Sequence, residues 1–239
     1  MSLRCAYVDL DGTLLGRDGS LLHDGAGQVT LAGARAVQAC LRADVELTIL
    51  SGRRRQPVLE AARLFGQSAY IYEAGACVVL DGEEHWLTGE LRPGELTIAE
   101  QVAATGAPDV LLEAYPGRLE YHSPWHRQRE VSHLFRGLVD AAEADALLAR
   151  AGHENLRLVD NGVISARSPA LASLDHVRCY HLLPGGVSKA AGIEFHRRVR
   201  GYAREETIAV GDSREDLACA PVVGRFFLCL LYTSDAADE

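Results

Sequence analysis

Short, mostly apolar runs separated by polar turns recur along the first third of the chain and again near its end. The runs at residues 5–10, 45–50, 69–72 and 207–210 are each followed closely by glycine or an acidic residue. Runs of this length are typical of strands buried on both faces of a parallel sheet. Apolar residues at helical spacing lie between the first three runs, at 33–43 and 57–65. This alternation predicts an α/β fold with a parallel sheet.

A long segment of different character interrupts this pattern. More than a hundred residues separate Ser51 from Lys189 in the printed sequence, far more than an ordinary loop needs. Asp81 and Gly82 form a hairpin-type turn, and we place the start of the insertion there. We therefore expect a core domain of residues 1–80 and 185–228 and an inserted domain of residues 81–184.

The pattern inside the insertion mixes helical and strand periodicities, so we expect an α+β domain. Two stretches have the spacing of amphipathic helices, and four shorter ones have the composition of strands. The expected helices are 94–105 and 131–151, and the expected strands are 110–113, 119–122, 156–160 and 163–166.

Two carboxylates stand at the end of the first apolar run. Asp9 and Asp11 are two residues apart, so both fall on one side of the expected strand. Two close carboxylates repel each other unless they share a cation or a proton, which favours a chemical role over a stabilising one. Gly12 and Thr13 follow directly, and we expect this turn to offer amide donors to an anion. The pattern suggests Mg2+-assisted phosphoryl transfer; an acidic turn without function is the alternative.

Three further segments bring polar groups to the ends of other expected strands. Ser51 and Gly52 follow the second run, Lys189 opens a helix that continues to about residue 200, and Asp212 and Asp216 follow the last run. The carboxyl ends of parallel strands share one sheet edge, where ligands of α/β proteins bind. Taken singly, Ser51 is equally consistent with a helix cap and Lys189 with a solvated lysine.

In this order, the segments Asp9 to Thr13, Ser51 to Arg53, Lys189, and Gly211 to Asp216 resemble the four motifs of the haloacid dehalogenase (HAD) superfamily of aspartate-nucleophile phosphatases. The resemblance implies a Rossmann-like core and an aspartyl-phosphate on Asp9. It implies that Asp11 acts as the acid and base. Many relatives carry Asn where this chain has Glu215. The resemblance therefore does not predict the geometry of the site around Glu215.

The same resemblance assigns the remaining motif residues. Phosphate would be held by Gly12, Thr13, Ser51, Gly52 and Lys189, with Lys189 also counted among the catalytic residues. Mg2+ would be bound by Asp9, Asp212 and the backbone carbonyl of Asp11, with Asp216 binding or supporting it. A Mg2+ ion suits a site of carboxylates without a His or Cys cluster.

The position of the insertion resembles that of the C2 cap in HAD subclass IIB. Residues 73–76, Glu-Ala-Gly-Ala, are similar to the Glu-Asn-Gly-Ala turn of those relatives, with Ala74 in place of Asn. Several of them hydrolyse sugar phosphates, so the expected activity is a phosphomonoesterase for a small phosphorylated metabolite. A phosphotransferase or mutase with the same intermediate remains an alternative. A phosphorylatable signalling domain without turnover is disfavoured, because Asp11 would discharge the phosphoryl group.

Substrate choice is expected to depend on the insertion. Arg118, Tyr121, His122 and Arg127 lie in a stretch that mixes aromatic rings with positively charged donors. Such side chains suit a sugar or a second anionic group. The alternative is that they are ordinary packed or solvated residues.

The composition of the chain argues against some classes of binding partner. The chain has 239 residues, a net charge of −9 and a pI near 5.5, which argues against nucleic acid or an anionic membrane as partner. Its six cysteines show no paired spacing, as expected for thiols in a reducing cytosol. No apolar leader or membrane-length run is present, so we expect a cytoplasmic protein. Its oligomeric state stays open.

The last residues differ from the rest of the chain. Residues 229–239 resemble the translation of a sequencing adapter, and we expect them to be a non-native tail after about Leu228. Without the three acidic residues of this tail the net charge changes from −9 to −6, still acidic. A natural acidic tail is the alternative.

Overall fold

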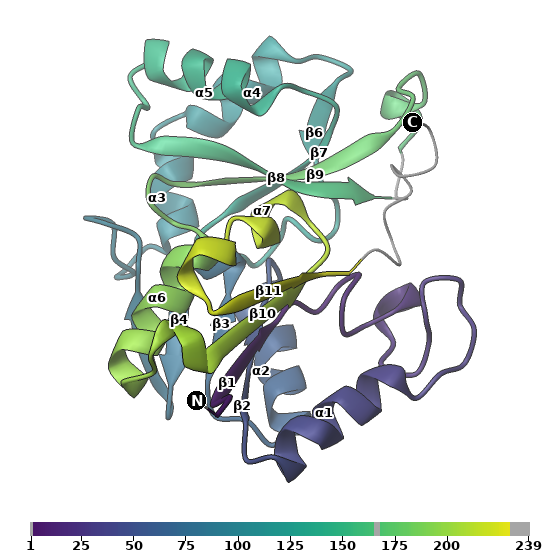
Figure 1. Cartoon of the computed structure of the whole chain (residues 1–239). Coiled ribbons are helices and arrows are strands. Elements are labelled where there is room, and N and C mark those ends of the chain that lie inside the picture. Colours follow the sequence, from purple (N-terminus) through teal and green to yellow (C-terminus); the bar gives the residue numbers. More distant parts are fainter. Residues whose placement is uncertain (1, 165–167, 230–239) are drawn as a thin grey trace. The chain divides into compact units, whose positions relative to one another are not determined.

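The computed structural model describes residues 2–164 and 168–229 and divides the chain into two units (Figure 1). The first unit, called the core unit here, contains Met1–Leu87 and the chain from Ser188 onward. The second, the inserted unit, is Thr88–Val187. Residues 230–239, most of the expected adapter-derived tail, lie outside the described residues.

A seven-stranded sheet forms the core unit, in the order β11-β10-β1-β2-β3-β4-β5. The strands from β11 to β3 are parallel, and β4 and β5 add an antiparallel hairpin at one edge. The expected parallel α/β core is confirmed. Its strands are β1 (Cys5–Val8), β2 (Glu46–Leu50), β3 (Tyr70–Tyr72), β4 (Cys77–Leu80), β5 (Glu83–Trp86), β10 (Thr207–Gly211) and β11 (Arg225–Leu228).

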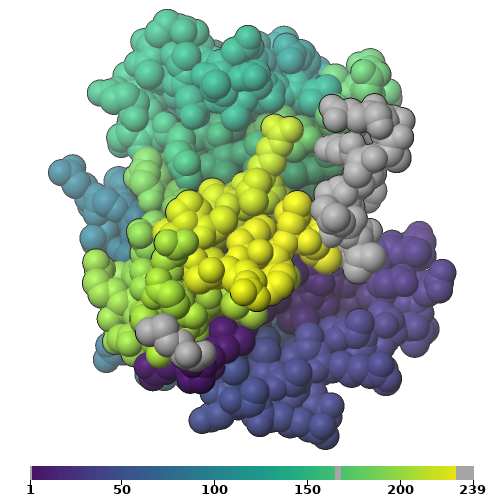
Figure 2. Space-filling view, viewed as in Figure 1, coloured from purple at the N-terminus to yellow at the C-terminus, as the bar shows by residue number. Residues whose placement is uncertain are grey.

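Both faces of this sheet are buried, as the apolar runs predict. In β1, Ala6 and Val8 join an apolar cluster with α1 and α2, whereas Cys5 and Tyr7 join a cluster with α6 on the other face. In the space-filling view the first residues (purple) lie beside those near residue 200 (yellow-green), as the parallel pairing of β1 with β10 requires (Figure 2). The helices are α1 (Ala32–Arg42), α2 (Arg55–Leu64), α6 (Lys189–Arg200) and α7 (Arg214–Leu217), with 3-10 turns at Arg17–Gly19, Glu73–Gly75, Arg204–Glu206 and Ala220–Val222.

The inserted unit is an α+β module with an antiparallel sheet in the order β6-β7-β9-β8. No helix among the described residues is long and apolar enough to cross a bilayer. Its strands are β6 (Leu119–Tyr121), β7 (His133–Gly137), β8 (Leu156–Ile164) and β9 (Val177–Pro184), and its helices are α3 (Ile98–Ala104), α4 (Ala107–Ala114), α5 (Ala141–Arg150) and the 3-10 turn Pro169–Leu171.

Several expected elements of the insertion are wrong in type. The segment 110–113 belongs to helix α4, and the first part of the expected helix 131–151 is strand β7. The expected strands 156–160 and 163–166 form one strand, β8, with a bulge between Asp160 and Val163; residues 165 and 166 lie outside the described residues. Strand β9 has no counterpart among the predicted elements.

The boundaries between the two units lie at different sequence positions from those expected. Strand β5 pairs with β4 and so continues the core sheet beyond Asp81. The structure therefore divides the chain at 87/88 and 187/188, whereas the sequence pattern placed the boundaries at 80/81 and 184/185.

Candidate active site

Asp9 stands directly after strand β1, at the edge of the core sheet where its parallel strands end. Its backbone N–H donates to the carbonyl of Val210 at 3.0 Å, and its own carbonyl accepts from Leu14 at 3.3 Å. Asp9 is 5% exposed. The neighbouring strand and the following turn thus fix the backbone of a buried carboxylate.

Lys189, the first residue of α6, lies between two carboxylates. Its Nζ donates to Asp9 Oδ1 and to Asp216 Oδ1, both at 2.7 Å, and the side chain is 2% exposed. The preceding residue, Ser188, caps the helix by accepting from the N–H of Ala191 at 3.1 Å. The structure therefore brings together three groups that lie 180 and 27 residues apart in the chain.

Burial and charge act in opposite directions on these groups. Burial alone would lower the pKa of Lys189, but Asp216, Asp9 and Glu215 outweigh it and raise that pKa above its ordinary value. Burial raises the pKa of Asp9, while the ammonium of Lys189 acts against the rise. For Asp216, Lys189 and the hydrogen bonds from Ser213 outweigh burial and lower the pKa. Lys189 is thus held as a cation beside Asp216.

Oxygen atoms of Asp9, Asp212 and Asp216 lie within 4.8 Å of one another, so the three carboxylates fit a divalent cation. Asp216 is already bound to Lys189 and to Ser213, whose hydroxyl donates to its Oδ2 at 2.6 Å. Burial and Asp216 raise the pKa of Asp212 to about 6, as expected for carboxylates gathered without a bound cation. The oxygen donors suit Mg2+, with Asp9 and Asp212 more available than Asp216.

Gly12 allows Asp212 to approach the first turn closely. Its φ is +78°, and a Cβ atom there would lie 2.2 Å from Asp212 Oδ2. The N–H groups of Gly12 and Thr13 donate to the carbonyls of Leu15 and Leu10. The expectation that these amides are available to an anion is therefore not met, because the turn uses them itself. The Thr13 hydroxyl donates to Asp212 Oδ1 at 3.4 Å.

Asp11 has a partner that the sequence reasoning missed. Arg53 donates from Nε to Asp11 Oδ2 at 2.7 Å and from Nη2 to the other carboxylate oxygen, a bidentate pair. The Asp11 side chain is 56% exposed, in contrast to Asp9. Arg53 directly follows Ser51 and Gly52 in the sequence. Its position beside these two expected site residues could have indicated that it also belongs to the site. The buried Ser51 hydroxyl accepts from the N–H of Arg53 at 3.2 Å.

The turn after β3 sets the start of α6. Glu73 and Ala74 have left-handed backbone conformations, with φ of 45° and 57°, and Gly75 follows with φ of 97°. A Cβ atom on Gly75 would lie 2.0 Å from the carbonyl oxygen of Ser188. Only glycine lets the two backbones approach this closely, so the segment 73–76 determines where Lys189 begins its helix.

The expected substrate residues of the insertion differ in their surroundings within that unit. The Tyr121 ring stacks on His126 and on Phe135, with centroids 5.0 and 4.9 Å apart. Arg118 donates to the carbonyl of Leu138 at 3.1 Å. His122 is buried, and burial together with nearby arginines lowers its pKa to about 4. Of the four, Arg118 and Arg127 are exposed.

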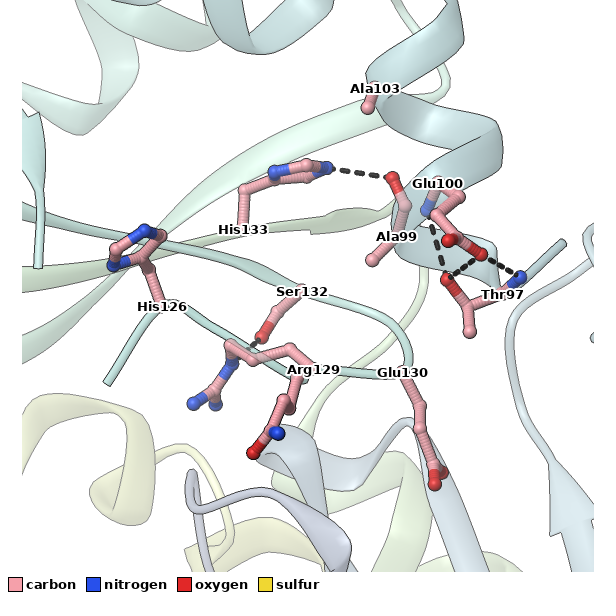
Figure 3. Close-up of a pocket in the computed structure, with 10 residues that line it drawn as sticks. Thr97, Ala99, Glu100, Ala103, His126, Arg129, Glu130, Ser132 and His133 are labelled. Carbon is pink, nitrogen blue, oxygen red and sulfur yellow. Dashed lines mark hydrogen bonds between the residues drawn. The ribbon is translucent and has the colours of Figure 1, made fainter. Parts of the chain in front are cut away.

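A different group of residues lines a pocket of about 350 Å³ in the inserted unit (Figure 3). Arg129, 8% exposed, donates to the Ser132 hydroxyl at 2.7 Å, and His133 hydrogen-bonds the carbonyl of Ala99 at 2.8 Å. His126 also faces the pocket, and its Nδ1 is buried without a hydrogen-bond partner in the described structure. In the sequence these residues are scattered histidines and arginines, and their spacing does not predict a pocket.

No protein-family model matches the sequence, and the search of curated proteins found no match. Solved structures do match. A HAD-like hydrolase from B. subtilis is 18% identical over 94% of this chain and 88% of its own, with a TM-score of 0.57. A HAD subclass IIB sugar phosphatase is 13% identical over 93% and 86%, with a TM-score of 0.59. The sucrose-phosphatase of Synechocystis sp., solved with sucrose and phosphate, is 15% identical over 95% and 83%, with a TM-score of 0.59.

At these identities the likeness concerns the fold. It spans both units of the chain, and it agrees with the parallel core sheet and the separate antiparallel sheet described above. The chain therefore has the fold of the HAD-like hydrolases, an α/β core with an inserted α+β unit, as its four motifs predict.

Proposed function

We propose that the protein is a Mg2+-dependent phosphomonoesterase in which Asp9 is the nucleophile. The observation that carries this proposal is the buried Asp9 carboxylate at a strand end, 2.7 Å from Lys189 and grouped with Asp212 and Asp216. A carboxylate can attack a phosphate dianion only where positive charge offsets their repulsion. Lys189 supplies one such charge. Mg2+ bound by Asp9 and Asp212 would supply the other.

The chain's own residues account for the chemical steps. Asp9 Oδ1 is held by Lys189, which leaves Oδ2 to attack phosphorus while the bond to the leaving oxygen breaks. Asp11 gives its proton to that oxygen and then takes one from water, whose attack on the aspartyl-phosphate releases phosphate and restores Asp9. Because Arg53 holds Asp11 in this structure, that ion pair must open for Asp11 to act. Ser51 would position the phosphoryl group.

We further propose a sugar phosphate or glycosyl phosphate as substrate. Two structural neighbours are described as a sugar phosphatase and a sucrose-phosphatase. The pocket of the inserted unit is compatible with this choice, because its lining includes histidine, arginine, serine and glutamate side chains that can hydrogen-bond hydroxyl groups. A transfer to a substrate hydroxyl in place of water would use the same groups and remains the second candidate.

The test is release of phosphate from p-nitrophenyl phosphate by the whole protein. Activity should require Mg2+, disappear in EDTA and return with added Mg2+. Asp212→Asn should raise the Mg2+ concentration needed for half activity at least tenfold or abolish activity, because it removes a charged ligand. Asp18→Asn is the control, since Asp18 is fully solvated at a left-handed position that Asn tolerates. Full activity in chelator would refute the proposal.

A further inference from the structure

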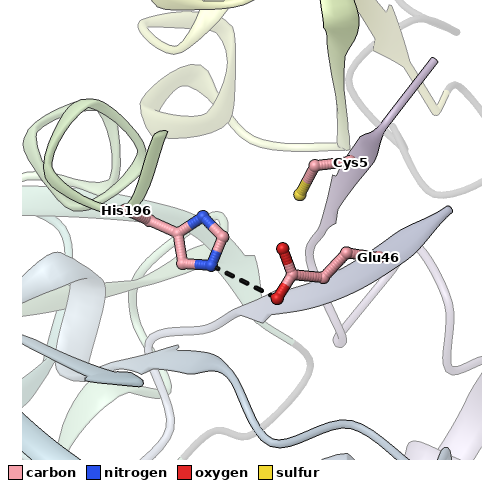
Figure 4. Close-up of side chains that lie close together, drawn as sticks. All are labelled: Cys5, Glu46 and His196. Carbon is pink, nitrogen blue, oxygen red and sulfur yellow. Dashed lines mark ion pairs between the residues drawn. The ribbon is translucent and has the colours of Figure 1, made fainter. Parts of the chain in front are cut away.

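A second cluster of side chains with metal-binding atoms lies inside the core unit, apart from the acidic site. It consists of Cys5, Glu46 and His196 (Figure 4), whose sulfur, carboxylate oxygen and imidazole nitrogen lie within 4.8 Å of one another. Cys5 and His196 are each 0% exposed, and the Glu46 side chain is 17% exposed. Glu46 therefore provides the contact of this cluster with solvent.

The fold itself brings these three residues together. Cys5 and Glu46 are partners in the parallel pairing of β1 with β2, so their side chains stand next to each other on one face of the sheet. Helix α6 covers that face and contributes His196, while Tyr7 stands two residues beyond Cys5 on the same face. Each ligand thus comes from a different, well-packed element.

His196 has one nitrogen satisfied and one not. Nδ1 lies 2.8 Å from the Tyr7 hydroxyl. Nε2 is buried without a hydrogen-bond partner in the described part of the chain, and it lies 3.7 Å from Glu46 Oε1. A buried polar atom left without a partner costs about 1–3 kcal/mol. A cation between Nε2, the carboxylate and the sulfur would remove this penalty.

The surrounding hydroxyl groups are arranged to support such an ion. If His196 donates its Nδ1 proton to the Tyr7 oxygen, the lone pair of Nε2 faces Glu46 and Cys5. Tyr202 donates to Glu46 Oε2 at 2.9 Å, and the Thr48 hydroxyl lies 3.5 Å from the Cys5 sulfur. Metal-binding histidines typically donate their second N–H in this way, and metal-binding carboxylates are typically hydrogen-bonded.

We propose that Cys5, Glu46 and His196 form a Zn2+ site. Zn2+ prefers Cys, His and carboxylate donors, and the thiolate and carboxylate together balance its charge. With Zn–S near 2.3 Å and Zn–N near 2.0 Å, the donor atoms, which lie within 4.8 Å of one another, would have to close around the ion. The guanidinium of Arg200, 3.3 Å from Glu46 Oε1, would give way to the ion and keep its bond to Asp81.

Binding at this site is coupled to the loss of a proton. Formation of the Zn–S bond breaks the S–H bond and releases the proton to solvent. The ion would then join β1, β2 and α6, the elements whose opposite ends lead to Asp9, Ser51 and Lys189. The site is separate from the chemistry proposed above.

Co2+ gives a direct test, because a thiolate bound to cobalt produces a near-ultraviolet charge-transfer absorption that carboxylate ligands do not give. Titrating the chelator-treated, full-length protein with Co2+ should produce this band with one equivalent, and Zn2+ should displace it. Cys5→Ser should abolish the band. Glu46→Gln, which keeps the shape of a partly exposed side chain, should weaken Co2+ binding at least tenfold.

Two controls separate this site from others in the core unit. Cys219→Ser changes another buried cysteine of the same apolar cluster and should keep the band. Asp212→Asn disables the acidic site and should also keep it, so failure of the proposed activity would not affect this result. Absence of the band in the wild-type protein, its survival in Cys5→Ser, or its equal loss in Cys219→Ser would overturn the proposal.

Discussion

At the scale of single residues, the central feature is a lysine buried between two carboxylates. Taking Lys189, Asp9 and Asp216 out of water is costly, and their mutual attraction repays that cost only with close, hydrogen-bonded geometry. Such an arrangement is poor evidence for a purely stabilising role. It is the arrangement expected where a bound cation offsets the excess negative charge of the carboxylates.

Gly75 gives the sharpest structural prediction at this scale. Gly75→Ala should destabilise the protein by roughly 1–3 kcal/mol through its left-handed backbone, and should lower kcat, because the new Cβ would displace Ser188 and hence Lys189. Gly66→Ala is the matched control, with φ of 71° and no atom within 4 Å of the added Cβ. Urea unfolding and phosphate release measure the two effects. Equal kcat in the two variants would contradict the positioning role.

The pKa of Asp212 predicts how Mg2+ binding changes with pH. The raised pKa of about 6 means that Asp212 is protonated in acid and must lose its proton when the ion binds. The apparent Kd for Mg2+ should therefore rise at least tenfold for each pH unit below 6, because the pKa of Asp9 is also raised and Asp9 would lose a proton as well. Calorimetric titration across this range tests the expectation. A Kd independent of pH would remove Asp212 from the site.

At the scale of elements, α6 is the helix on which the site depends. It starts with Lys189, its cap is Ser188, and Gly192 gives it close contact with Ile71 of β3. Small shifts at its first turn therefore move the lysine relative to Asp9, which is fixed on β1. The position of this helix matters more for the chemistry than its intrinsic helical propensity.

Substituting the residue that caps α6 tests whether this cap affects activity in addition to stability. Ser188→Ala and Thr97→Ala each delete a serine or threonine that caps a helix, α6 in the core unit and α3 in the inserted unit. Each should cost about 1 kcal/mol of unfolding free energy. Only Ser188→Ala should reduce kcat for p-nitrophenyl phosphate, by several fold. If both variants kept wild-type kcat, the first turn of α6 would not control the lysine.

The sequence predicted the elements of the core far better than those of the insertion. Fully buried parallel strands leave continuous apolar runs, so β1, β2, β3 and β10 were found together with the acidic residues at their ends. The pair of Asp11 with Arg53 could not be found in this way, because it depends on side-chain direction across two turns.

The errors in the insertion have physical causes. Val131, Leu134 and Phe135 have helical spacing, yet tertiary pairing makes this segment strand β7, whose Gly137 lies so close to Arg118 that a Cβ would be 2.0 Å from its carbonyl oxygen. Residues 110–113 resemble a strand in isolation, but Pro108 in the first turn and an apolar face favour helix α4. Short apolar runs do not distinguish the two states.

At the scale of the whole molecule, the chain has its acidic site in the core unit and a pocket in the inserted unit. The core unit offers carboxylates, a lysine and a serine, which cannot distinguish one metabolite from another. The inserted unit offers a pocket of about 350 Å³ with a more varied lining. We therefore expect the inserted unit to determine which phosphate ester is used.

Substitution of His126 tests whether the inserted unit determines which substrate is used. His126→Ala should raise KM at least several fold for the best sugar phosphate of a panel, while p-nitrophenyl phosphate hydrolysis stays within about twofold. The reason is that His126 lines the pocket, so its removal would change the surface that the pocket offers to a ligand. His153→Ala, in the same unit but outside the pocket lining, is the control. Equal losses on both substrates would show that His126 supports folding instead.

The central claim is that Asp9 carries the phosphoryl group during turnover. Borohydride reduces an aspartyl-phosphate to homoserine, so protein quenched during turnover of a phosphate ester and then reduced should contain homoserine at position 9, detected by peptide mass spectrometry. Asp9→Asn should show neither the product nor turnover, while its unfolding transition is retained. Homoserine at another position, or full turnover by Asp9→Asn, would contradict the account.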